Sequence, residues 1–247
     1  MSTIHLGTSG WSYAHWVGPF YPDTVPQNQW LAYYARRLRS VEINNTFYHL
    51  PSPQAIASWR DATPTHFVFA VKASRFITHV KRLLEPRQTL PPFFERVTHL
   101  QGKLGPILFQ LPARFPFSPD RLAEFLHALP AGFAYAFEFR DCAWFNDRTY
   151  RLLAAQNAAL CIYEFDGQTA PMEVTADFVY VRLHGPDGPY RGSYGEERLA
   201  QWAARCRAWI KEHKDVFFYF DNDEAGHAPR NALALAGLLT LDTEGAP

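Results

Sequence analysis

Cysteine is scarce in this sequence, and none of it lies in a recognisable motif. The three cysteines, Cys142, Cys161 and Cys206, lack the close spacing of zinc and redox sites, and an odd number is poorly suited to a disulfide framework. The sequence also lacks a basic N-terminal region followed by an apolar stretch, and it nowhere approaches the ~20 apolar residues of a membrane span. We therefore expect a cytoplasmic protein in a reducing compartment, without a membrane segment.

Three further signals are missing. No G-x-G-x-x-G follows the first expected strand, which removes the usual motif for a nucleotide cofactor. Ser9 and Ser74 are not part of a G-x-S-x-G elbow, so nothing supports a serine hydrolase. Net charge is absent too, because Lys plus Arg and Asp plus Glu each number 24. This balance disfavours nucleic acid as a partner, and it favours solvated helix faces for the basic runs at 35–39 and 75–83.

What the sequence does have is hydrophobic material in alternating segments. Hydrophobic residues make up 47% of the 247 residues and aromatic residues 16%, enough for the core of one barrel. Hydrophobic runs predict eight strands, near 3–8, 40–44, 67–73, 106–111, 134–140, 158–163, 178–184 and 216–221. Helical patterns lie between and after them, near 27–38, 53–61, 87–102, 119–128, 147–157, 195–213 and 229–240, with a short weak one near 169–172.

The order of these segments predicts the fold class. Alternation of strand and helix implies a parallel sheet with right-handed crossovers. Eight such units favour closure into a barrel over an open doubly wound sheet. We predict an α/β fold, a single (β/α)8 TIM-type barrel domain over residues 1–247. Ser118-Pro119 and Ala228-Pro229 are predicted helix starts, because proline is tolerated at the first helical position.

Most of the expected strands end on polar side chains. Alternate residues of a strand face opposite sides, so Glu42 and Asn44 share one face, as do Glu138 and Arg140. Barrels of this class place active sites at the C-terminal ends of their strands, and many converging charges without a ligand would be costly to desolvate. We therefore predict a ligand site; the alternative is an internally paired network that holds the strand ends in register. The residues predicted to face inward are Glu42, Asn44, Lys72, Gln110, Glu138, Arg140, Arg182, His184 and Asp221.

The charges of these residues limit the classes of ligand that the site could bind. Three acidic and three basic side chains make a near-neutral site, which suits a small polar or phosphorylated ligand with hydroxyl, carboxylate or phosphate groups. A divalent metal is the less favoured possibility, since the site has neighbouring cations and no HxH or HExxH pair. If a metal is present, its ligands would be Glu42, Glu138, His184 and Asp221.

Three loops are further candidates. Loop 185–195 and segment 221–232 follow the last two expected strands, where barrels often bind phosphate. Arg230 and the free N–H groups of the helix start would contact an anion there, and an ordinary glycine turn with a capped helix start is the alternative. The aromatic residues of loop 9–26 could stack on a ligand, although plugging of the barrel mouth is favoured.

Long motifs in the chain resemble a known family. VEINNTFYHLPS (41–52), FAVKASRFITH (69–79), FEFRDCAWF (137–145) and YVRLHGPDGPYRGSY (180–194) are similar to segments of the bacterial family of domain of unknown function 72, the YecE-like proteins. The resemblance spans nearly the whole chain and implies a (β/α) barrel related in architecture to xylose-isomerase-like barrels. It also implies that the polar strand-end positions of the family correspond to the residues predicted to face inward and to Asn222. Glu164 lies in a segment more acidic than the resemblance implies.

The leading hypothesis is an enzyme that uses acid/base chemistry on a small polar, anionic or polyhydroxylated metabolite at the C-terminal barrel mouth. Hydrolase, lyase and isomerase reactions remain open, as does the oligomeric state. The alternatives are a non-catalytic small-ligand binding or sensing barrel and a nucleic-acid-processing protein. Glu138 and Glu42 would be acid and base, Lys72 an electrophile or base, and His184 and Asp221 a proton shuttle and its orienter. The binding residues would be Asn44, Gln110, Arg140, Arg182, Asn222 and Arg230.

Overall fold

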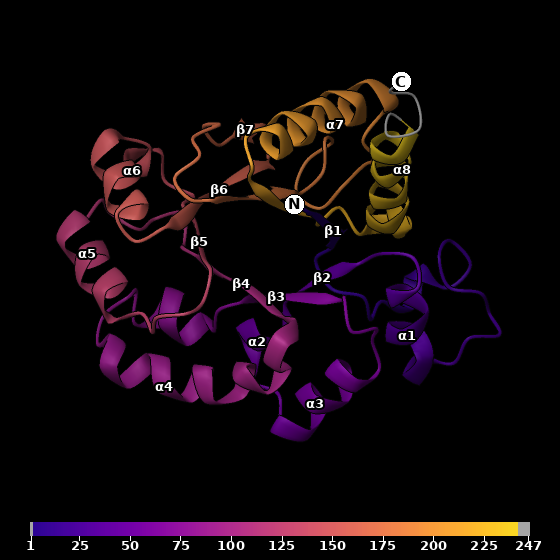
Figure 1. The fold of residues 1–247 in the computed structure, drawn as a ribbon, viewed down its shortest axis with the longest axis horizontal. Helices are drawn as coiled ribbons and strands as arrows, with labels where there is room; N and C mark the ends of the chain where they lie inside the picture. The colour runs from indigo at the N-terminus through magenta and orange to yellow at the C-terminus, as the bar shows by residue number, and fades with distance from the viewer. Residues whose placement is uncertain (1, 242–247) are drawn as a thin grey trace. The chain divides into compact units, whose positions relative to one another are not determined.

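The computed structural model describes residues 2–241 and forms two compact units (Figure 1). Unit 1 comprises Met1–Val41, Tyr163–Thr169 and Phe178–Pro247, and unit 2 comprises Glu42–Ile162 and Ala170–Asp177. Each unit has its own strands and covering helices. Two strands, β2 (Ser40–Ile43) and β6 (Ala158–Phe165), begin in one unit and end in the other.

Unit 1 is built on three parallel strands. β9 (Asp215–Phe220) lies between β1 (Ile4–Thr8) and β8 (Phe178–Leu183), with Leu6 opposite Phe218 and Arg182 opposite Tyr219. These runs are rich in aromatic and β-branched residues on both faces, which is typical of buried parallel strands. Helices α7 (Glu196–Lys211) and α8 (His227–Leu241) pack against each other and against β9 (Figure 1). Unit 1 also holds η1 (Ala14–Trp16), η2 (Gln27–Gln29), α1 (Trp30–Ala35) and η6 (Glu224–Gly226).

A close backbone approach fixes the start of β2 beside β1. A Cβ atom at Gly7 would clash with the carbonyl of Ser40, so only glycine fits there. The buried hydroxyl of Tyr34 lies between the strands, where it accepts from the Thr8 amide at 2.9 Å and donates to the Ser40 carbonyl at 3.0 Å. This contact holds the C-terminal end of β1, and with it the segment that begins at Ser9.

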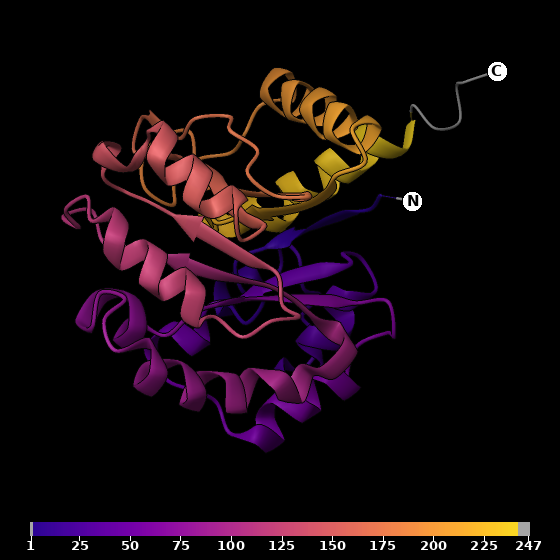
Figure 2. The same ribbon diagram turned by 60° about the vertical axis from the view of Figure 1, so that its left-hand side comes forward.

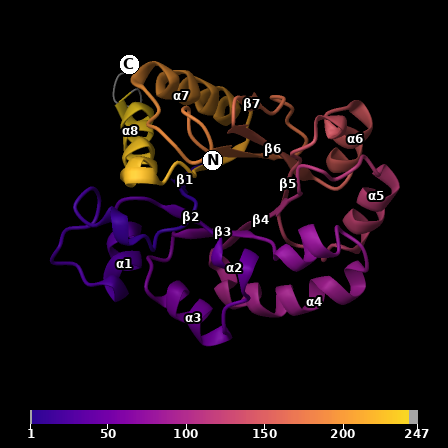
Figure 3. The ribbon, with the colours of Figure 1, turned by 180° about the vertical axis from the view of Figure 1, so that it is seen from behind.

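Unit 2 continues the parallel arrangement. β4 (Leu104–Gln110) lies between β3 (Val68–Lys72) and β5 (Tyr135–Glu138), with Lys72 opposite Leu108 and Gln110 opposite Glu138. Helices α3 to α6 follow one another in contact along these strands (Figures 2 and 3). They are α3 (Pro53–Asp61), α4 (Pro86–Val97), α5 (Pro119–Ala128) and α6 (Asp147–Ala154), joined by the shorter α2 (Asn45–Tyr48), η3 (Phe76–Val80), η4 (Thr98–Lys103) and η5 (Cys142–Trp144).

The strand order confirms the predicted fold class. It runs β1-β9-β8-β6-β5-β4-β3-β2, and helices separate the successive strands, except between β6 and β8, as in a (β/α)8 TIM-type barrel. All eight predicted strands form, with ends within two residues of the expected ones. That the chain is a single domain over 1–247 stays a prediction. No helix among residues 2–241 combines the length and apolar character needed to cross a membrane.

Two details of the prediction are wrong. No helix forms near 169–172; instead β7 (Gln168–Thr169) pairs antiparallel with the end of β6. The physical reason is the Asp166-Gly167 dipeptide, whose φ angles of 49° and 74° suit the tight turn of a hairpin. The last helix begins at His227, so Pro229 lies within its first turn and does not start it. Pro119 is the first residue of α5, as predicted.

Candidate functional site

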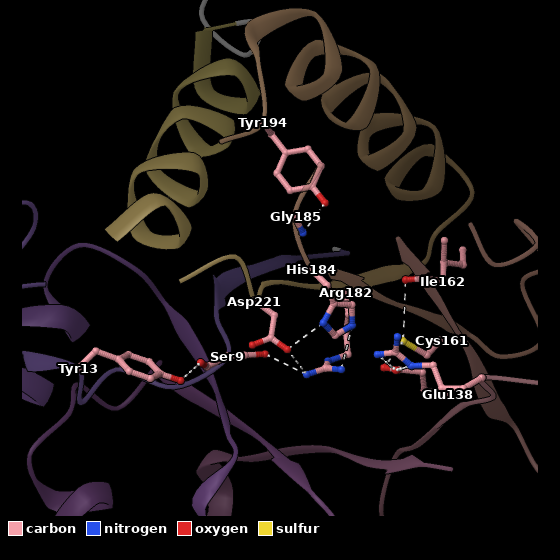
Figure 4. A network of polar contacts seen from close by, with 11 residues as sticks. Ser9, Tyr13, Glu138, Cys161, Ile162, Arg182, His184, Gly185, Tyr194 and Asp221 are labelled. Carbon is pink, nitrogen blue, oxygen red and sulfur yellow. Dashed lines mark hydrogen bonds and ion pairs between the residues drawn. The ribbon is translucent and has the colours of Figure 1, made fainter. Parts of the chain in front are cut away.

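A buried cluster of charged groups lies at the C-terminal ends of β8 and β9 in unit 1. Oδ2 of Asp221 lies 2.8 Å from Nη2 of Arg182 and 2.9 Å from Nδ1 of His184 (Figure 4). Nη2 of Arg182 also donates to Oγ of Ser9 at 3.2 Å. Arg182 is 0%, His184 1% and Asp221 8% exposed, so Asp221 reaches furthest toward solvent. Arg182, His184 and Asp221 belong to the set predicted to face inward, and Ser9 does not; that these residues form a ligand site stays a prediction.

Both ring nitrogens of His184 face protein groups. A guanidinium only donates hydrogen bonds, so Nε2 of His184, 3.1 Å from Nη1 of Arg182, acts as the acceptor and the ring proton lies on Nδ1. Nδ1 lies 2.9 Å from Oδ2 of Asp221 without a well-aligned hydrogen bond, so the carboxylate faces the N–H side of the ring. The rings of Phe165 and Tyr190 meet it edge-on. This arrangement favours a neutral, positioned imidazole, and the role of proton shuttle stays a prediction.

The loop at 185–195 is held by protein side chains. The amide of Gly185 donates to the Tyr194 hydroxyl at 3.0 Å (Figure 4). Nδ2 of Asn222 donates to the Gly192 carbonyl and to Oδ1 of Asn231, both at 2.8 Å. Asn222 is 0% exposed, and its Oδ1 has no hydrogen-bond partner among residues 2–241. These contacts favour a structural role for Asn222 over ligand binding, and they favour the glycine-turn alternative over a phosphate cradle.

Arg230, in the first turn of α8, contacts the backbone just before that helix. Its Nε donates to the Gly226 carbonyl at 3.1 Å and its Nη2 to the Ala225 carbonyl at 2.5 Å. Ala225 has a φ of 52°, so these bonds help to hold a strained turn. The contacts favour the capped helix start over the predicted contact of Arg230 with an anion.

Loop 9–26 supplies core packing rather than an open aromatic surface. Trp16 and Tyr21 are 0% exposed, and Tyr21 stacks on Trp30 with ring centroids 4.9 Å apart. The loop also contacts the segment after β9, because Nε2 of His15 lies 2.7 Å from the Asp223 carbonyl. Burial, and secondly the charge of Asp221, raises the pKa of the Asp223 carboxyl. This burial agrees with the favoured prediction, in which the aromatic rings of the loop fill the barrel mouth and do not stack on a ligand.

In unit 2, the predicted acidic residues are the most deeply buried of the strand-end groups. Glu42 and Glu138 are both 0% exposed. Oε1 of Glu138 lies 2.5 Å from both Nε and Nη2 of Arg140, and its Oε2 accepts from the thiol of Cys161 at 3.7 Å (Figure 4). The carboxylate therefore orients the Arg140 guanidinium from the buried side.

The donor groups of unit 2 are nearer the surface. Asn44, Lys72, Gln110 and Arg140 are each partly exposed, and they follow or end the neighbouring strands β2, β3, β4 and β5. Nζ of Lys72 lies 4.5 Å from the centre of the Phe47 ring. The ammonium and amide groups of this set are hydrogen-bond donors, so the accessible polar surface at these strand ends is suited to an anion.

His79, in the π-helix η3 that follows β3, lies near the same lysine. Burial, together with the positive charges of Lys72, Arg75 and Arg82, lowers the pKa of His79 to about 4. Its ring meets Phe47 edge-on, with centroids 5.0 Å apart. A π-turn often marks a functional site. The sequence gave no sign of it, because no side-chain pattern distinguishes such a short turn.

Glu164, whose segment departs from the expected one, has a structural partner. Its carboxylate forms an ion pair with Arg198 of α7, and its backbone carbonyl accepts from the His184 amide at 3.0 Å. It therefore ties the end of β6 to α7 and to the end of β8.

The remaining site predictions have these outcomes. That the strand-end residues of the two units converge on one ligand stays a prediction. Among the residues that the structure describes, no group of three or more His, Cys, Asp or Glu side chains is arranged to hold a metal ion. Cys142 is exposed and Cys161 and Cys206 are buried, and none of these three is in a disulfide bond within the described ranges.

Comparison with known proteins agrees with the motifs. The chain matches the family described as "Protein of unknown function DUF72" over residues 5–247. The YunF protein of Bacillus subtilis is 26% identical over 275 aligned positions that cover 98% of this chain and 96% of YunF. The YecE protein of Escherichia coli is 33% identical over 143 residues, which are 58% of this chain, and the match spans 50% of the length of YecE.

A solved structure shares the fold. The crystal structure of a DUF72 family protein from Thermotoga maritima aligns with a TM-score of 0.87 and 28% sequence identity, over 96% of this chain and 99% of that one. The similarity extends through both units, and it supports the (β/α)8 class derived from the strand order.

Proposed function

This chain belongs to the DUF72 family, and from its own geometry we propose that it is an enzyme acting on a small anionic, polar metabolite by acid/base chemistry. The observation that carries the proposal is the arrangement in unit 2, where Lys72 and Gln110 are partly exposed at strand ends and Arg140 keeps 9% of its side chain exposed, while Glu42 and Glu138 are buried. Carboxylate or phosphate groups are the ligands that such donors favour.

Each accessible donor has a distinct proposed role. Arg140, oriented by Glu138 through two contacts of 2.5 Å, binds two oxygens of the anion. The side-chain amide of Gln110 is held near the strand end, because its Nε2 donates to the Leu111 carbonyl at 2.9 Å. Its Oε1 accepts a hydrogen bond from a hydroxyl group of the ligand. Lys72 exchanges the proton, since it is the accessible strand-end group of unit 2 that can both contact an anion and change its protonation state.

The assignments in unit 1 follow from exposure. Arg182 and His184 are enclosed by their own contacts, so we assign them as positioning residues. Asp221, at 8% exposure, is the charged member of the cluster nearest to solvent. Hydrolase, lyase and isomerase reactions all remain compatible with these groups, and a cytoplasmic location is part of the proposal.

A second candidate is a binding or sensing protein without turnover. The observation in its favour is that the Arg182, His184 and Asp221 charges satisfy one another, and that the acids of unit 2 are buried. Such a site has hydrogen-bond donors that can bind a ligand, but few accessible groups that can transfer a proton.

One experiment separates the two candidates. The purified protein is screened by thermal shift against phosphorylated, carboxylated and neutral polyhydroxylated metabolites, with DNA and RNA oligonucleotides as further ligands, and hits are incubated while NMR follows product formation. We expect anions to raise Tm, and the rise to disappear in Arg140→Gln and Lys72→Met. Arg148→Gln, which changes an exposed arginine paired with Asp120, is the matched control and should keep the rise.

The outcomes are distinct. Product formation that Lys72→Met abolishes supports the enzyme. Capture without product over long incubation supports the binding protein. Preference for neutral ligands or for oligonucleotides, or binding unchanged in both variants, overturns the proposed anion site.

A further inference from the structure

Unit 1 has a cavity at the end of β1 opposite to the buried charge cluster. Its volume is about 290 Å³, and it is lined by aliphatic side chains of β1 and α8, by Leu38, by Thr240, and by two arginines, Arg37 and Arg39. Ile4, the first residue of β1, contributes to the lining, whereas Ser9 follows the last residue of that strand. At ~3.3 Å per residue, the lining residues Leu6 and Ile4 lie about 10 and 16 Å along the strand from Ser9. The cavity is therefore separate from the buried charge cluster of unit 1.

The two arginines make one side of this cavity cationic. Arg37 and Arg39 are both exposed, on the segment that joins α1 to β2. The Arg37 guanidinium lies over the Tyr33 ring at 3.5 Å and donates to the Tyr33 carbonyl at 3.2 Å. Within residues 2–241, neither arginine forms an ion pair with a carboxylate. One side of the cavity therefore carries two guanidinium groups.

The opposite side is apolar. Leu6 and Leu38 are 6% and 2% exposed, and Leu239 lines the cavity from the last turns of α8. A polar ligand would gain nothing from these side chains, whereas an aliphatic chain would be removed from water by them. The volume lies near the lower limit of ~300 Å³ for small-molecule pockets, which suits a single short chain.

We propose that this cavity binds an amphipathic monoanion, the carboxylate of a medium-length aliphatic chain. The carboxylate lies between the guanidinium groups of Arg37 and Arg39, with paired hydrogen bonds of the kind that arginine forms with carboxylates. The chain extends along Leu38 toward Leu239. Charge complementarity at one end and apolar lining at the other select this ligand class over a neutral chain and over an anion without a chain.

The test uses octanoate, its neutral analogue octanamide, and acetate, in calorimetric titrations of the whole protein. We expect saturable binding of octanoate with one site per chain, and at least ten-fold weaker binding of octanamide and of acetate. Arg39→Gln should weaken octanoate binding at least ten-fold. Arg36→Gln is the matched control, because Arg36 is an exposed arginine of the same basic run that does not line the cavity.

A second variant tests the apolar side. Ala236 lines the cavity from α8 and is partly exposed, so Ala236→Phe fills the space without burying a new polar group. We expect it to abolish octanoate binding while the circular dichroism spectrum stays unchanged. The proposal is overturned if octanoate does not bind, if octanamide binds equally well, if binding does not saturate, or if Arg39→Gln and Arg36→Gln behave alike.

Discussion

Glu138 holds Arg140 through two contacts to one oxygen, since Oε1 lies 2.5 Å from both Nε and Nη2 of the guanidinium. The side chain of Glu138 is 0% and that of Arg140 9% exposed, so the pair is buried on the carboxylate side. The two residues are separated by one position at the end of β5, and they share a face of that segment. Orientation of the guanidinium by a buried carboxylate is what the proposed anion site requires.

Removal of the Glu138 charge should therefore destabilise the protein strongly. For Glu138→Gln we expect the free energy of unfolding to fall by roughly 3–5 kcal/mol, because one partner of a buried pair is left uncompensated. Urea denaturation measures the change. Asp120→Asn, which breaks the exposed pair with Arg148, is the control and should change stability by less than about 1 kcal/mol. Similar losses in the two variants would show that the Glu138 contacts contribute no more than a surface pair.

His79 should make stability depend on pH. Burial and nearby cations lower its pKa from the ordinary 6.5 to about 4, so between these values the unfolded chain binds more protons than the folded one. The contribution of His79 to the free energy of unfolding should thus be fully present above pH 6.5, and it should decrease as the pH falls toward 4. His79→Gln should flatten this dependence, whereas His66→Gln, at an exposed histidine, should preserve it. Urea titrations between pH 4.5 and 7 test this; equal slopes in both variants would contradict it.

The strand ends were predictable because the relevant information is local. Period-two alternation placed Glu42 with Asn44 and Glu138 with Arg140, and the contact of Arg140 with Glu138 follows from that spacing. The resemblance to the family implied the same polar strand-end positions. The fold class followed from the alternation of strands and helices along the chain.

The pairing of distant groups was not predictable in the same way. Arg182 could have been matched with any acid of the inward set, and only the tertiary structure pairs it with Asp221 on the next strand. Likewise, the contacts of the Asn222 amide with Gly192 and Asn231 come from the tertiary structure, and ligand binding by Asn222 stays a prediction. Local patterns identify polar strand ends, but partner choice depends on registers and loop paths that patterns do not specify.

Asn231 should be the main support of the loop at 185–195. It is 4% exposed; its Oδ1 accepts from the Tyr194 amide at 3.1 Å and from Asn222, and its Nδ2 donates to the Tyr194 carbonyl at 3.2 Å. For Asn231→Ala we expect a loss of about 1–3 kcal/mol, since buried donors and acceptors lose their partner. Hydrogen exchange should also rise in the loop. Ser193→Ala, which removes one exposed partner of Asn231, should leave exchange nearly unchanged, and equal effects would contradict the assignment.

His213 offers a stabilising substitution at the end of α7. It has a φ of 62°, and the following amide, Lys214, donates to the Trp209 carbonyl at 2.9 Å, a helix-ending pattern in which glycine is preferred. A non-glycine residue in the left-handed region costs roughly 1–2 kcal/mol, and glycine loses about 0.5–1 kcal/mol more backbone entropy on folding. His213→Gly should thus raise the free energy of unfolding by about 0.5–1 kcal/mol. Lys211→Gly, two residues earlier and still helical, should lower it by about 1 kcal/mol. Urea denaturation of both variants decides the matter, because a shift of the same sign in both would mean that the left-handed conformation at His213 carries no strain.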